Sequence, residues 1–139
     1  MIELDNKSTL RVDIHLLQKI ADTLTNKEIE LVITDDAEIQ KINAEYRKID
    51  KATDVLSFPY EEMPMSPLGS IVISENFVTT KAKELHHSND AEMALLFIHG
   101  LLHILGYDHE IDSGEMREKE KNLIELFKLP KSLIVRTEG

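Results

Sequence analysis

The sequence predicts an α+β domain in which a small mixed four-stranded sheet is packed with about five helices. Four short segments have strand-like alternation or β-branched runs, and five longer segments have apolar residues at helical spacing. Their order is strand, helix, strand, helix, two strands and then three helices. We find no internal repeat, linker or low-complexity tract, so we expect one domain over residues 1–139.

The first half of the chain is predicted to contain two strands, at residues 1–6 and 28–34, and two helices, at residues 13–24 and 35–46. The first strand alternates weakly and is expected at a sheet edge. Asp13 and Asp35 are the expected N-caps, because an Asp side chain accepts hydrogen bonds from the first helical turn. Glu38 follows Asp35 by three residues and completes a capping-box pattern.

The second half is predicted to contain strands at 54–58 and 69–73, a loop at 60–67, and helices at 75–87, 89–105 and 114–127. We expect Pro59 to end the first of these strands. Ser74 is the expected cap of the next helix, and Asn89 with Glu92 forms a second capping-box pattern. We expect His86 and His87 to be exposed at a helix end.

Three histidines mark the end of the helix predicted at 89–105. His99 and His103 are four residues apart and therefore share one helix face. Gly106 can adopt a left-handed conformation that ends the helix, so that His109 returns toward the pair. Three imidazoles with one open position form a catalytic zinc site. The apolar residues around them predict that this site lies at the end of a buried central helix.

The spacing of these histidines also matches the zinc protease pattern H-E-x-x-H-x-x-G-x-x-H, except that Gly100 replaces the glutamate. An all-imidazole ligand set suits zinc best, although nickel, copper or iron remain open by ligand type. Asp108 and Glu110 are candidates to orient the imidazoles, and equally good candidates for ordinary solvated acids.

The segment H-G-x-L-H-x-x-G-Y-D-H closely resembles the signature of the YbeY family of bacterial endoribonucleases. The resemblance extends to Tyr46-Arg47, Asp50, and the runs at 53–59 and 68–74. It implies an α+β fold and a zinc-dependent enzyme that cuts single-stranded RNA. It further implies maturation of the 16S ribosomal RNA 3′ end, ribosome quality control, and ribosomal RNA and ribosome-associated proteins as partners.

Arg47 is the candidate catalytic residue beside the metal ligands. Its planar guanidinium can bind a phosphate through two hydrogen bonds, whereas a pair with a surface acid is the alternative. The resemblance favours catalysis, because the matching arginine of the family lies in the cleft and is implicated in RNA cleavage. Asp54 and Ser57 rank below Arg47. Ser70 departs from the family, which commonly has Asp there.

Composition constrains the partners. The chain has no cysteine, so thiolate metal sites and disulfides are excluded. Its net charge of −10 opposes nonspecific binding of nucleic acid, DNA included. A local cluster of basic residues reconciles this charge with an RNA substrate: Lys41, Arg47, Lys48 and Lys51. We find neither a signal peptide nor a membrane span, and we expect a cytoplasmic protein.

Two alternatives stay open. The histidine spacing allows a metalloprotease, which Gly100 opposes because it removes the general base. A non-catalytic ribosome-associated factor with a structural metal is the other, although no fourth ligand is obvious in the motif.

Overall fold

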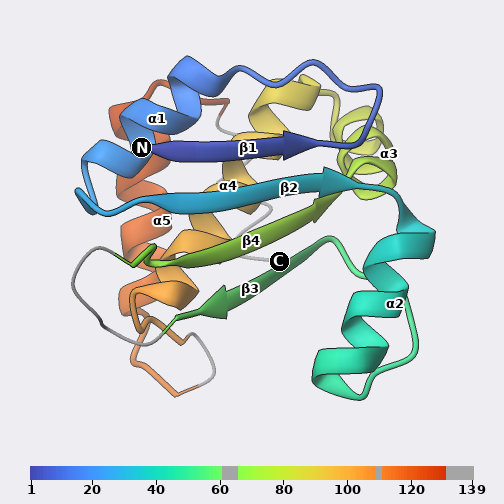
Figure 1. Ribbon diagram of the computed structural model, residues 1–139. Coiled ribbons are helices and arrows are strands. Elements are labelled where there is room, and N and C mark those ends of the chain that lie inside the picture. Colours follow the sequence, from blue (N-terminus) through green and yellow to red (C-terminus); the bar gives the residue numbers. More distant parts are fainter. Residues whose placement is uncertain (61–65, 109–110, 131–139) are drawn as a thin grey trace.

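The computed structural model describes residues 1–60, 66–108 and 111–130 (Figure 1). Within them it confirms the α+β class with a mixed four-stranded sheet and five helices. The strands are β1 (Ile2–Asn6), β2 (Ile29–Thr34), β3 (Val55–Pro59) and β4 (Gly69–Ser74). The helices are α1 (Ile14–Asp22), α2 (Asp36–Arg47), α3 (Glu75–Leu85), α4 (Asn89–Ile104) and α5 (Glu115–Leu126).

The strand order in the sheet is β1-β2-β4-β3. Strand β2 pairs in parallel with both β1 and β4, and β3 pairs antiparallel with β4. Strands β1 and β3 therefore form the two edges, which confirms the edge position predicted for residues 1–6. Pro59 was expected to follow the last residue of its strand, but it is itself the last residue of β3. The neighbouring Tyr60 N–H donates to the Leu68 carbonyl, so the Pro59 nitrogen faces the free edge, where no donor is needed.

Helix α4 is the centre of the main core, as its composition predicts. It lies behind the sheet with α1 and α5 in the view of Figure 1, while α2 stands apart from them. Its Phe97, Leu101 and Leu102 are fully buried in one cluster with the inward side chains of β2 and β4. The alternate residues of the sheet face the other way, where Leu56 of β3 and Val72 of β4 pack with Ile39 of α2.

The predicted caps of the first three helices are confirmed. Asp13, Asp35 and Ser74 each accept a hydrogen bond from the backbone N–H three residues along. The capping box at Asp35 is only half formed, because the Glu38 carboxylate bonds with Lys7 at 3.0 Å and Thr34 at 3.0 Å.

The start of α4 differs from the prediction. Its N-cap is Ser88, whose hydroxyl accepts from the Ala91 N–H at 3.0 Å, so the expected cap at Asn89 is wrong by one residue. Glu92 does not serve as a capping residue, because its carboxylate is buried and lies 2.9 Å from the His87 Nε2. The capping pattern misled because tertiary packing draws Glu92 into the interior.

His87 is likewise not exposed, contrary to the prediction. Helix α3 ends two residues early because His86 takes a left-handed conformation with φ of 57°. This turn directs the His87 side chain, which is 1% exposed, to Glu92 on α4. His86 itself is exposed, as predicted. The remaining helix and strand ends lie within two residues of the predictions.

Candidate metal centre

His99 and His103 lie side by side on the last turns of α4. Their Nε2 atoms are 3.1 Å apart, with ring centroids at 4.6 Å and an angle of 79° between the ring planes. Two imidazoles bound tetrahedrally to one zinc ion would have their nitrogens about 3.3 Å apart, from a Zn–N distance of about 2.05 Å. The pair therefore fits a zinc ion without rearrangement of α4.

The turn after α4 has the predicted geometry. Gly106 has φ of 104°, and its N–H donates to the His103 carbonyl at 3.1 Å. The Tyr107 N–H reaches back to the Leu102 carbonyl at 3.0 Å, which satisfies another terminal carbonyl of α4. The chain thus turns back beside the two histidines.

The third proposed ligand, His109, lies outside the described residues, as does Glu110. Within residues 1–60, 66–108 and 111–130, no three metal-ligating side chains are grouped to hold an ion. The pair formed by His99 and His103 is thus observed, and the complete set of three histidines stays a prediction.

A carboxylate from α5 contacts this pair. The Glu120 Oε1 lies 3.2 Å from the His99 Nδ1, and the Glu120 side chain is 7% exposed. We did not predict this residue, because it is 21 positions from His99 and local spacing does not reveal the contact. The available signal was an acid on the apolar stripe of α5, four residues after Met116 and four before Ile124.

Gly100 faces the sheet. A Cβ atom at this position would lie 3.0 Å from the Ile71 Cγ2 and 3.4 Å from the Val55 Cγ2. A glutamate here would insert its carboxylate between α4 and the sheet, in surroundings that contain apolar side chains. The position at which the protease carries its general base therefore packs against the sheet in this chain.

Arg47, the last residue of α2, is held by β3. Its guanidinium donates to the Ser57 carbonyl at 2.7 Å and lies 5.4 Å from the centroid of the Phe58 ring. That carbonyl points to the free edge of β3, and the Ser57 side chain belongs to the sheet face that α4 covers. Among the described residues, Arg47 makes its contacts with β3, and not with a surface acid or with the two histidines.

A model of the family described as Endoribonuclease YbeY matches residues 2–128. The chain belongs to this family. Membership confirms the predicted resemblance and, with it, the expectation of an RNA-cutting hydrolase.

Individual relatives agree with the family model. A YbeY endoribonuclease of Sulfurimonas denitrificans is 62% identical over 139 residues and covers both chains completely. One from Sulfurovum is 58% identical, with coverage of 99% of this chain and 98% of the relative. A solution structure of a Thermotoga maritima protein is 28% identical, with a TM-score of 0.63 and coverage of 91% of this chain and 89% of that one.

The departure from the YbeY pattern at Ser70 lies away from α4. Ser70 alternates with the inward-facing Ile71 on β4 and so belongs to the opposite sheet face. There it lines an open groove of about 540 Å³ with Tyr46, Phe58 and Tyr60. Burial and the neighbouring Glu30 raise the pKa of the Tyr60 hydroxyl, which hydrogen-bonds with Ser70. The Ser70 side chain is therefore on the sheet face opposite to the one that α4 covers.

Asp54 has a local role. Its Oδ1 accepts from the Val55 N–H at 2.8 Å and from the Thr53 hydroxyl at 3.4 Å. Its carbonyl accepts from the Ser74 N–H at 2.9 Å, which connects the start of β3 to the end of β4. These bonds give Asp54 a part in the scaffold of this YbeY protein.

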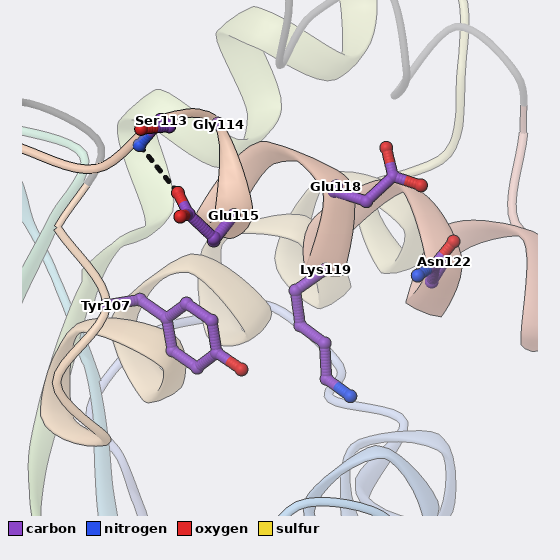
Figure 2. A pocket seen from close by; sticks show the side chains of 7 residues that line it. All are labelled: Tyr107, Ser113, Gly114, Glu115, Glu118, Lys119 and Asn122. Atoms are coloured by element: carbon purple, nitrogen blue, oxygen red, sulfur yellow. Dashed lines mark hydrogen bonds between the residues drawn. The ribbon is translucent and has the colours of Figure 1, made fainter.

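Tyr107 packs beside α4, directly after the turn at Gly106. Its ring is half-buried against the main core and forms one wall of a hollow of about 530 Å³ along α5 (Figure 2). Figure 2 shows Glu118, Lys119 and Asn122 of α5, which also line the hollow. The Glu115 carboxylate accepts from the Ser113 N–H at 2.6 Å. Glu120 is not among the residues that line this hollow.

No helix in the described part of this YbeY chain combines the length and the apolar character needed to cross a bilayer.

Proposed function

We propose that the protein cuts single-stranded ribosomal RNA with a zinc ion held by His99, His103 and His109. We further propose that it acts in the cytoplasm, in maturation of the 16S ribosomal RNA 3′ end and in ribosome quality control, together with the ribosome or ribosome-associated proteins. The observation that carries the proposal is the 3.1 Å separation of the two Nε2 atoms, which suits a shared metal ion.

The donor set determines which chemistry the site can support. Zinc bound by imidazoles at an open site supplies a Lewis acid and lowers the pKa of a bound water toward ~7. Helix α4 would contribute two of the ligands, and the buried residues beside them hold this helix in the core. Arg47 would bind the phosphate, since its fork matches two phosphate oxygens.

The charge distribution supports an RNA substrate at the α2 end of the molecule. Lys41, Arg47, Lys48 and Lys51 are all exposed, and they lie on the second half of α2 and in the segment that follows. Such a cluster can attract phosphates locally although the net charge of the whole chain is −10. Arg47 connects this basic segment to the free edge of β3.

The protease alternative is opposed by the packing at Gly100. The protease mechanism needs a carboxylate directly after the first histidine. In this chain a side chain at that position would extend toward Ile71 and Val55 of the sheet, and not toward a substrate.

The proposal is tested by offering the purified protein three substrates: a labelled single-stranded RNA, the same RNA annealed to its complement, and casein. We expect internal cuts in the single strand, little cleavage of the duplex, intact casein, and loss of cleavage with a chelator. Chelator-sensitive proteolysis without RNA cleavage would favour the protease. Zinc binding without hydrolysis of any of the three substrates would favour a structural metal.

A further inference from the structure

Glu120 lies on the buried face of α5, between Met116, which is fully buried, and Ile124, also fully buried. Removing a carboxylate from water in this way is unfavourable unless a hydrogen-bond donor compensates it. The His99 Nδ1, at 3.2 Å from the Glu120 Oε1, is such a donor. In this contact the His99 Nδ1 donates and the Glu120 carboxylate accepts.

Because a carboxylate oxygen accepts, the proton of a neutral His99 ring is on Nδ1. The lone pair of that ring is then on Nε2. This is the nitrogen that faces the His103 Nε2 at 3.1 Å. Neutral histidine in water favours the opposite arrangement, with the proton on Nε2, so the carboxylate selects the form that can ligate.

We propose that Glu120 is a positioning residue, which holds His99 as the Nδ1–H tautomer and presents its Nε2 lone pair to the metal position. This inference rests on the proposed function, because the metal ligation by His99 is itself proposed. It adds α5 to the elements that build the site. In other proteins, carboxylates that hold the second nitrogen of a ligating imidazole commonly contribute roughly 10–100-fold to metal affinity.

The test compares Glu120→Gln and Glu120→Ala with Glu118→Gln, which changes the same charge at an exposed position of the same helix. Zinc affinity is measured by competition with a chromophoric chelator. We expect Glu120→Ala to bind zinc roughly 10–100-fold more weakly than wild type. Glu120→Gln should lose less, because its amide oxygen still accepts from Nδ1, and Glu118→Gln should match wild type.

A second measurement uses the metal-free protein. Nitrogen-15 NMR of the histidine rings reports which nitrogen carries the proton, independently of zinc and of activity. We expect the Nδ1–H form of His99 in wild type and in Glu118→Gln, and a shift toward the Nε2–H form in Glu120→Ala. Melting temperatures of the metal-free variants identify any loss of fold, in which case the nearly isosteric Glu120→Gln carries the comparison.

An unchanged His99 tautomer in folded Glu120→Ala, or a wild-type zinc affinity in every folded Glu120 variant, would overturn the inference. A wild-type protein that binds no zinc would contradict the proposed function instead. The tautomer comparison would still decide the role of Glu120 in that case.

Discussion

Arg47 combines two contacts that bear on its role. One of the five N–H groups of its guanidinium goes to the Ser57 carbonyl, and the plane of the group lies near the Phe58 ring. Both contacts orient the side chain along the free edge of β3. A guanidinium oriented in advance loses less entropy when it binds a phosphate, so these contacts are compatible with catalysis.

Arg47→Lys keeps the charge and removes the planar fork. If Arg47 stabilises the phosphate in the transition state, cleavage should slow on the order of 10²-fold, or about 3 kcal/mol. Loss of the hydrogen bond to Ser57 should cost only about 0.5–1.5 kcal/mol of stability. The measurement is single-turnover RNA cleavage with urea unfolding and zinc content alongside.

Arg11→Lys is the matched control, because Arg11 is exposed and far along the chain from the proposed site residues. It should cut RNA at the wild-type rate. If Arg47→Lys also cuts RNA at the wild-type rate, Arg47 serves only to connect α2 to the edge of β3.

At the scale of the elements, α4 is fixed by close packing on β3 and β4. A Cβ atom at Gly69 would lie 2.6 Å from the Phe58 carbonyl oxygen and 3.0 Å from the Ile104 Cδ1. Glycine at this position, as at Gly100, lets the helix approach the sheet closely. The two histidines are thereby held on a rigid support.

The contact between His87 and Glu92 joins the end of α3 to the start of α4. Both side chains are almost completely buried, so removal of the imidazole takes a buried hydrogen bond from the carboxylate. His87→Ala should destabilise the protein by about 1–3 kcal/mol in urea unfolding. His86→Asn is the control and should be nearly neutral, because His86 is exposed and Asn accepts its left-handed conformation. Equal stability of the two variants would show that the buried pair contributes nothing.

Local patterns predicted most of the elements, and tertiary contacts account for what they missed. Alternation and helical spacing located all four strands and five helices of the described residues, because one face of each packs on a core. The spacing of His99 and His103 likewise placed their rings together. Glu92 and Glu120 were missed as partners of histidines, since each contact depends on how one helix packs on another. The contact of Arg47 with the Ser57 carbonyl was also missed. Every residue has a backbone carbonyl, so the sequence does not indicate which one a side chain will contact.

At the scale of the whole molecule, the two sheet faces have different characters. Helices α1, α4 and α5 cover one face with apolar residues (Figure 1). The opposite face carries carboxylates on two neighbouring strands, because Glu3 of β1 is in register with Glu30 of β2. Acidic charge thus gathers on β1 and β2 while basic charge gathers at the end of α2, which explains how an acidic chain can present a basic segment.

Glu3 provides a pH-dependent test of this charge distribution. The pKa of its carboxyl is raised, chiefly because it hydrogen-bonds with that of Glu28, and further by repulsion from Glu28 and Glu30. An acid with a raised pKa in the folded state binds its proton more tightly there, so stability falls as pH rises through the carboxyl range. Glu3→Gln should therefore melt at a higher temperature than wild type at pH 7.

The advantage of Glu3→Gln should shrink as pH falls below the ordinary carboxyl pKa, and it should also shrink with added salt. Thermal melts across this range test both trends, with the exposed Glu125→Gln as control. A variant less stable than wild type at pH 7 would show that the ionised carboxylate is favourable in the fold.

The proposed function requires that a metal ion held by the α4 histidines enables this protein to cut RNA. The most direct measurement is cleavage of a single-stranded RNA by protein stripped of metal and then titrated with zinc, for wild type and His103→Ala. We expect no cleavage by the stripped protein, full recovery of wild type at about one zinc per chain, and no recovery of His103→Ala. Wild-type cleavage by the stripped protein, or recovery of His103→Ala at the same zinc ratio, would contradict the claim.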